Sequence, residues 1–175
     1  MIKKEKGFSL IELLIVVAII LIIAAIAIPN LLRSRMAANE ASAVGSIRTM
    51  NTAAITYNST YGIGYPPSLA SIGTTGTTAS CTNAELLDSV LTSGAKSGYT
   101  FALVAGTVAT ASSAVPSGCT AGYTDGYVVT AVPQNPGTTG QRGFCSDATG
   151  VIRYNVSSTA GYTSPLCTTA QNPLQ

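Results

Sequence analysis

The hydrophobic positions of the 175-residue chain form first an almost uninterrupted run and then a periodic pattern. From Phe8 to Ile28 there are 21 residues, of which only Ser9 and Glu12 are polar. A helix of that length spans about 31 Å, which is enough to cross the hydrocarbon core of a bilayer. Residues 8–28 are therefore predicted to form a membrane-spanning helix.

The next segment has the hydrophobic period of an amphipathic helix. Its apolar residues recur three, four or seven positions apart, at Leu32, Met36, Ala43, Ile47, Met50 and Ala54. Pro29 stands between the two patterns and has no amide N–H, so we expect it to kink or loosen a helix that otherwise continues. We predict one long helix over residues 8–58, whose second half anchors a head domain. Arg33, Arg35 and Glu40 are expected to be solvated on its other faces.

Residues 59–175 change to a composition rich in Thr, Ser, Gly and Ala, interrupted by strand patterns. Alternating apolar and polar positions predict strands at 99–103, 127–131, 143–146 and 151–156. The last two are joined by a turn that Gly150 closes, as in a β-hairpin. We therefore predict an α+β fold, in which an antiparallel sheet of about four strands packs on the long helix.

A short helix and two loops complete the predicted head. The sequence Thr82-Asn83-Ala84-Glu85 has the form of a capping box, and an apolar face follows it. A helix is therefore predicted at 83–93, with Gly94 at its stop position. Residues 73–80 and 105–122 show no clear period and are predicted to be surface loops.

Three tyrosines, Tyr57, Tyr61 and Tyr65, recur at four-residue spacing near the predicted end of the long helix. We expect them to cover the edge of the sheet with their hydroxyls in water, because tyrosine combines an apolar ring with a polar tip. An aromatic path for electrons is the alternative.

Composition and charge disfavour most catalytic functions. Charged residues make up 9% of the chain, the formal net charge is +2, and there is no His. A basic field for nucleic acid and the commonest general base are therefore both missing. No Ser, Cys or carboxylate has a recognisable partner base, and the acidic residues do not cluster, so we expect no enzyme, metal, cofactor or small-molecule substrate.

The topology and the cysteines point to an oxidising compartment for the head. Lys3, Lys4 and Lys6 precede the apolar run, so the positive-inside rule predicts a cytoplasmic amino terminus and an external head. The four cysteines, at positions 81, 119, 145 and 167, have no CxxC spacing and are better explained as disulfides. Four cysteines allow three pairings.

Two simpler explanations of the apolar run are a secretory signal peptide and a plain membrane anchor. The run is longer than the usual apolar region of a signal peptide. It also contains Glu12, and an ionisable group inside a spanning helix costs about 2.5 to 3.5 kcal/mol. Both features argue for a more specific function of this helix.

The sequence Gly7-Phe8-Ser9-Leu10-Ile11-Glu12, followed by the apolar run and Pro29, resembles the class III leader of type IV pilins and pseudopilins. The resemblance implies that residues 1–7 are a leader peptide. A membrane-embedded prepilin peptidase would cut between Gly7 and Phe8 on the cytoplasmic face and methylate the new Phe8 amine.

The same resemblance implies how the chain assembles. The Glu12 carboxylate of one copy would meet the Phe8 amine of a neighbour in the core of a helical homopolymer, with an assembly ATPase and an inner-membrane platform protein as partners. By the same similarity, Cys145 pairs with Cys167, which leaves Cys81 for Cys119.

We therefore expect the major subunit of a type IV pilus-like filament, anchored in the inner membrane before assembly and extracellular afterwards. A minor pilin or a type II secretion pseudopilin shares the same amino-terminal features. A membrane-tethered adhesin is the alternative from another class of protein.

Overall fold

The structure is a computed structural model of the chain. It describes residues 7, 9–74, 78–106, 108–109, 119, 123–156, 167 and 172–174, and of residues 108, 109 and 123 it describes the backbone only. The chain separates into two compact units, Met1–Arg35 and Met36–Gln175. The first unit holds the start of the long helix, and the second holds the rest of this helix with the sheet.

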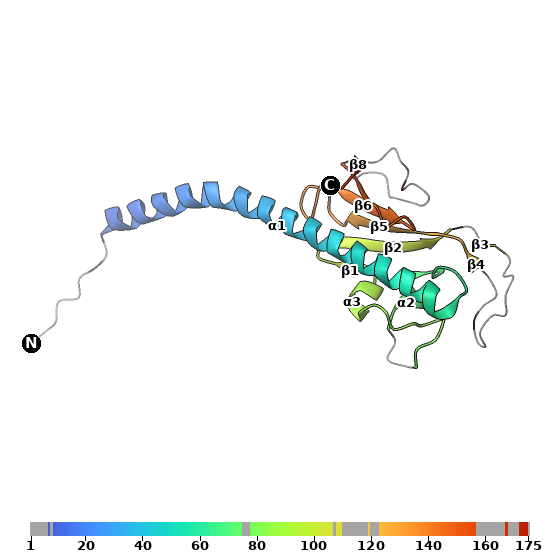
Figure 1. Cartoon of the computed structure of the whole chain (residues 1–175). Coiled ribbons are helices and arrows are strands. Elements are labelled where there is room, and N and C mark those ends of the chain that lie inside the picture. Colours follow the sequence, from blue (N-terminus) through green and yellow to red (C-terminus); the bar gives the residue numbers. More distant parts are fainter. Residues whose placement is uncertain are drawn as a thin grey trace, which may run out of the picture. The chain divides into compact units, whose positions relative to one another are not determined.

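Helix α1 spans Leu10–Tyr61 and includes Pro29 (Figure 1). Its first turn is closed by Ser9, whose carbonyl accepts a hydrogen bond from the Leu13 N–H at 3.2 Å. The helix runs three residues beyond the predicted end at residue 58. It stops where Gly62 takes a left-handed conformation (φ +65) and donates its N–H to the Asn58 carbonyl at 2.9 Å. A glycine in this conformation is the usual helix stop because it has no Cβ to clash.

Among the residues that the structure describes, the main sheet has six antiparallel strands in the spatial order β1-β2-β5-β6-β7-β8. Their bounds are β1 Ala95–Lys96, β2 Tyr99–Ala105, β5 Tyr127–Pro133, β6 Gly143–Asp147, β7 Ile152–Asn155 and β8 Asn172–Pro173. A second sheet pairs β3 (Val108–Ala109) with β4 (Tyr123–Thr124). The four predicted strands are β2, β5, β6 and β7. The prediction lacks β1, β3, β4 and β8 because two-residue strands carry no periodic signal. Strand β3 lies within residues 105–122, so the loop predicted there contains a short strand.

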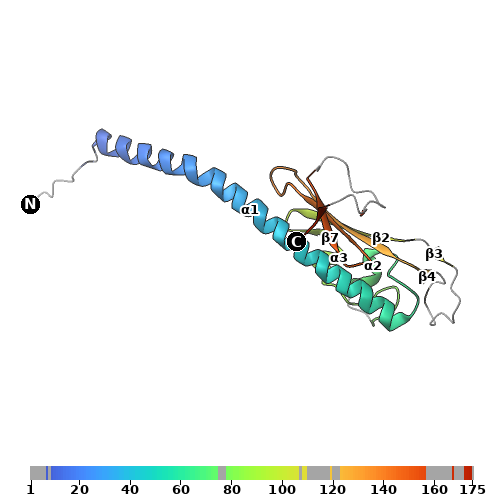
Figure 2. The ribbon, with the colours of Figure 1, turned by 45° about the horizontal axis from the view of Figure 1, so that its top comes forward.

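The core of the second unit lies between α1 and one face of this sheet, and Figures 1 and 2 both show the helix running along the strands. On β2 and β5, the residues that alternation predicts to face inward are all buried: Tyr99, Phe101, Leu103, Tyr127, Val129 and Ala131. Thr130 on β5 is buried as well. They pack with residues of the predicted apolar stripe of α1, among them Ala43, Ile47, Met50 and Ala54. The α+β prediction is thus confirmed.

A buried polar network also joins α1 to the sheet. Asn51 on α1 donates its amide to Ser146 Oγ on β6 at 2.8 Å, and its carbonyl oxygen accepts from the Tyr127 hydroxyl on β5 at 3.2 Å. Burial, with smaller contributions from Tyr65 and Asp147, raises the pKa of Tyr127 to about 12. Because these groups have no water to bond instead, they favour one register of the helix on the sheet.

The prediction of a helix at 83–93 is wrong. Helix α3 spans only Ser89–Thr92, and the residues before it pair with the end of α2 (Leu69–Ile72). The N–H groups of Ala84 and Leu86 donate to carbonyls of α2 at 2.9 and 3.0 Å, so these donors have partners without a helix. The cap of α3 is Asp88, whose Oδ1 accepts from the Leu91 N–H at 2.8 Å. Gly94 does lie at the stop position, with φ +78.

Two disulfides tie loops to the head. Cys81 is bonded to Cys119 and Cys145 to Cys167, with Cα–Cα distances of 5.6 and 5.7 Å. The Cys81 carbonyl also accepts a hydrogen bond from the Tyr57 hydroxyl at 2.7 Å. Tyr57 is only 1% exposed, so the expectation that its hydroxyl is in water is wrong. The hydrogen bond from Tyr57 to Cys81 thus attaches the Cys81 loop to the end of α1.

Candidate assembly surfaces

The first candidate surface is the apolar part of α1 in the unit of residues 1–35. The large aliphatic side chains from Leu10 to Leu32 are between 45% and 74% exposed, on all sides of the helix. By length and composition, this helix contains one segment able to cross a membrane, and none of that segment is buried. So much contiguous apolar surface is unfavourable in water. The surface is favourable only where an apolar environment covers it.

Glu12 is the one ionisable residue of this surface between Leu10 and Leu32. Its carboxylate accepts a hydrogen bond from the Ser9 N–H at 3.0 Å, as the third residue of a capping box does. Sequence reasoning missed this contact, although the Ser-x-x-Glu spacing predicts it. Glu12 makes no ion pair with any residue that the structure describes. The carboxylate therefore has no cationic partner within this part of the chain.

The predicted processing site precedes this helix in the sequence. Gly7 is exposed, and Phe8 lies outside the described residues. Cleavage between them, methylation of Phe8 and the pairing of its amine with Glu12 therefore stay predictions. The kink at Pro29 also stays a prediction.

The second candidate surface lies in the head, where Glu40 proves not to be a solvated residue. It is 8% exposed, and its Oε2 lies 2.7 Å from Nη2 of Arg142. Its Oε1 accepts the backbone N–H groups of Gln141 and Arg142 at 2.9 and 3.2 Å. The sequence does not reveal this pair because its two members lie 102 positions apart. Glu40 thus fixes the segment that enters β6 against α1.

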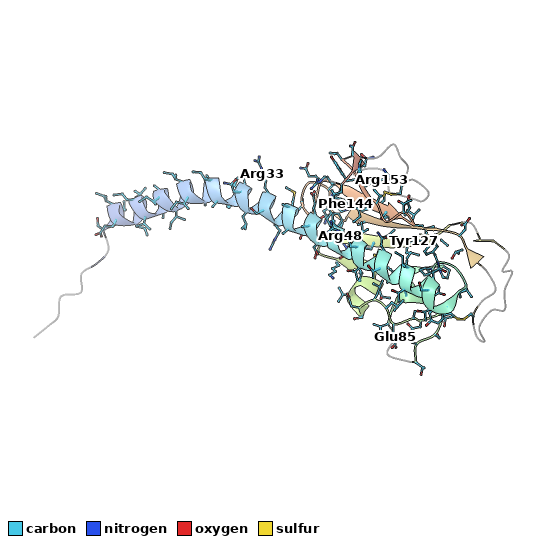
Figure 3. All side chains as sticks on the ribbon, viewed as in Figure 1. Arg33, Arg48, Glu85, Tyr127, Phe144 and Arg153 are labelled. Atoms are coloured by element: carbon cyan, nitrogen blue, oxygen red, sulfur yellow. A yellow bond between two sulfur atoms is a disulfide. The ribbon has the colours of Figure 1, made fainter. Side chains whose placement is uncertain are left out.

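Beside this ion pair is an open hollow of about 310 Å³ that we call the Arg48 groove. Its lining includes Ala37, Ala41, Val44, Arg48, Phe144 and Leu174. The Arg142 guanidinium is held over the rings of Phe144 and Tyr154, 5.6 and 5.3 Å from their centres. Figure 3 labels Arg48 and Phe144, which both line the groove. The groove therefore combines apolar side chains with the Glu40–Arg142 ion pair and with Arg48, an exposed cation that has no ion-pair partner among the described residues.

The acidic residues of the head have structural functions or lie apart. Asp88 caps α3, and Asp147 accepts the Thr149 N–H at 2.9 Å in the hairpin turn. Glu85 is exposed, at a φ of +54. Within the part of the chain that the structure describes, no three His, Cys, Asp or Glu residues come close enough to hold a metal ion.

Comparisons with known proteins agree with the amino-terminal pattern. Residues 2–28 match the family model described as the prokaryotic N-terminal methylation motif. A 38-residue segment is 63% identical to the type IV wide pilus major component PilA4 of Thermus thermophilus, covering 22% of this chain and 29% of that protein. The chain thus spans less than a third of the length of this curated relative. No solved structure matches the chain.

A long amino-terminal helix with an uncovered apolar first half, packed in its second half on an antiparallel sheet, defines an α+β pilin-like fold. The matched amino-terminal segment carries the N-terminal methylation motif, and over this segment the chain is similar to the type IV pilins, with their class III leader.

Proposed function

We propose that this chain is the major structural subunit of a type IV pilus-like extracellular filament. The observation that carries the proposal is the apolar surface of residues 10–32, which lies uncovered directly after a leader of the type IV pilin family. Such a surface suits a helix that is held first in a bilayer and then among copies of itself. The function is structural and non-enzymatic, as in the rest of the family.

The chain occupies two locations in turn, first the inner membrane and then the extracellular filament. Before assembly the chain lies in the inner membrane, with residues 1–7 in the cytoplasm, residues 8–28 in the bilayer and the head, residues 59–175, outside. A prepilin peptidase removes the leader, and an assembly ATPase and a platform protein drive polymerisation. Loss of residues 1–7 leaves six basic and six acidic side chains, so repulsion between closely packed copies is small.

In the filament, Glu12 pairs with the amine that cleavage creates on Phe8 of a neighbour. A buried pair of this kind adds little net stability, but leaving one member unpaired costs about 3 to 5 kcal/mol. The pair therefore selects one axial stagger of neighbouring helices. It also explains why a carboxylate is tolerated among the exposed aliphatic side chains of α1.

The experiment that tests this function is mass spectrometry of the amino-terminal peptide from filaments sheared off intact cells. A dominant peptide that begins at N-methylated Phe8 supports both processing and the function of major subunit. The same peptide found only in membranes would replace this proposal by a minor pilin, a pseudopilin or a membrane-tethered adhesin. A peptide that begins near Ile28 would indicate a secretory signal instead.

The function of Glu12 predicts the effect of one substitution. Glu12→Gln removes the charge and leaves the Phe8 amine unpaired in the filament core, so the amount of filament should fall by about a hundredfold. Immunoblots of the sheared and membrane fractions measure this, and the membrane form should still lack its leader. Asp147→Asn makes the same chemical change in a head turn and serves as the control. Normal filament yield from Glu12→Gln would overturn the pairing.

A further inference from the structure

Two exposed charges of the head have no side-chain partner among the described residues. One is Arg48, in the groove defined above, and the other is Glu85, in the loop between α2 and α3. Every other carboxylate described in the head has at least one partner. A charge that its own chain leaves unpaired is available to another molecule.

Apolar surface accompanies both charges. The Arg48 groove has an apolar lining that includes Ala41 and Leu174. Five positions after Glu85, Val90 on α3 is 53% exposed. The segment from Glu85 to Val90 thus presents the carboxylates of Glu85 and Asp88 and the aliphatic side chain of Val90. The groove presents the Arg48 guanidinium, the Glu40–Arg142 ion pair and an apolar wall. The two surfaces are complementary in both charge and polarity.

The two surfaces lie toward opposite edges of the six-stranded sheet. Helix α3 contacts β1, which is one edge strand, whereas the groove is lined by Phe144 of β6 and by Leu174, which follows the other edge strand, β8. Figure 3 shows Glu85 well apart from Arg48 and Phe144. A chain cannot therefore fill its own groove with this segment, but a second copy can.

We propose that the Arg48 groove receives the Glu85–Val90 segment of a second copy of this chain, with an ion pair between Arg48 and Glu85. The inference rests on the proposed function and adds a contact between heads to the packing of helices. Because the complementary surfaces are different patches of one molecule, the contact is heterologous. Contacts of this type repeat in open helical polymers when the rotation does not close a ring.

The position of Lys96 excludes it as an equivalent partner. Lys96 lies on β1, at the same edge of the sheet as α3. A Lys96–Glu85 contact would therefore join like edges and close a dimer, whereas an Arg48–Glu85 contact joins unlike edges and leaves both ends open. Lys96 is thus the matched control residue.

The first test is cross-linking in filaments of the full chain. In the Arg48→Lys variant the cation is kept and gains an amine, so a zero-length carbodiimide should link position 48 to Glu85 of another copy. Unmodified filaments give no link at position 48, because arginine does not react. The unassembled membrane form of Arg48→Lys should give none either. Filaments that lack this link, or that link Lys96 to Glu85 instead, would overturn the proposal.

The second test exchanges the charges. Arg48→Glu and Glu85→Arg should each lower the filament yield by roughly tenfold, and the double exchange should restore it. The Lys96→Glu, Glu85→Arg double variant has the same net charge and should not be restored. Normal levels of processed chain in the membrane show that the variants fold. If the unmodified chain forms no filaments, the proposed function itself fails; if it forms filaments that both exchanges leave unchanged, only this contact fails.

Discussion

At the scale of single residues, three tyrosines bury their rings in the head while their hydroxyls donate to fixed acceptors. Tyr57 and Tyr99 donate to backbone carbonyls at 2.7 and 2.8 Å, and Tyr127 donates to Asn51. Burial raises the pKa of all three above the usual value of 10.0. The folded head therefore keeps these protons at a pH where an unfolded chain has lost them.

Tyr127 gives a prediction about pH. The unfolded chain releases this proton near pH 10 and the folded head near pH 12, so stability is fully present below pH 10 and falls as the pH rises to about 12. Tyr127→Phe should make this fall less steep. At pH 7 the variant should lose about 1 to 3 kcal/mol, because Asn51 loses a buried donor.

Urea unfolding of the full chain in detergent, from pH 7 to pH 12, measures both effects. Tyr61→Phe is the control, because the described residues give its hydroxyl no hydrogen bond. An unchanged pH dependence in Tyr127→Phe would contradict the assignment of the raised pKa to this residue.

At the scale of elements, capping side chains decide where the short helices of the head begin. Ser68 and Ser71 form a reciprocal capping box at α2, and Asp88 caps α3. Thr82, which the sequence pattern favours as a cap, lies in a turn outside both helices. The pairing of the 84–87 segment with α2 thus overrides a local helix signal.

This assignment predicts different effects for two alanine substitutions. Asp88→Ala should cost about 1 kcal/mol of folding free energy, because the Leu91 N–H loses its acceptor. Thr82→Ala should stay within about 0.5 kcal/mol, as for an ordinary surface position. Thermal unfolding of the two variants measures the difference. A larger loss for Thr82→Ala than for Asp88→Ala would contradict this assignment and support the capping box that the sequence predicts at Thr82.

At the scale of the whole molecule, two disulfides hold together segments that are far apart in sequence. They join residues 38 and 22 positions apart. Cys145 is 1% exposed in the middle of β6, so its bridge starts inside the core. In the proposed extracellular filament no chaperone can refold a damaged subunit, which favours such covalent links.

Removal of either bridge should lower the free energy of unfolding by about 2 to 5 kcal/mol. The Cys81→Ala, Cys119→Ala variant should lose slightly more than the Cys145→Ala, Cys167→Ala variant, because its bridge closes the longer loop. Urea unfolding without reductant measures the loss in each variant. The unmodified chain unfolded with reductant gives the sum of the two losses. A loss below about 1 kcal/mol for either pair would show that the bridge is dispensable.

The predictions from sequence succeed where the signal is local. The apolar run from residue 8, the stripe of α1 and the alternation in β2, β5, β6 and β7 each depend on residues a few positions apart. The same is true of the leader motif, which the family comparison confirms. The predictions fail at the two-residue strands β1, β3, β4 and β8, at the four-residue helix α2 and at the start of α3.

The sequence by itself thus determined the class III leader motif, the apolar helix and the order of the main elements, because helix and strand periods depend on residues a few positions apart. Only the tertiary structure decided that Glu40 is buried against Arg142, that Asn51 meets Ser146, and that the Arg48 groove and Glu85 lie toward opposite edges of the sheet. Each of these depends on residues tens of positions apart, whose meeting is set by the packing of the core and leaves no pattern along the chain.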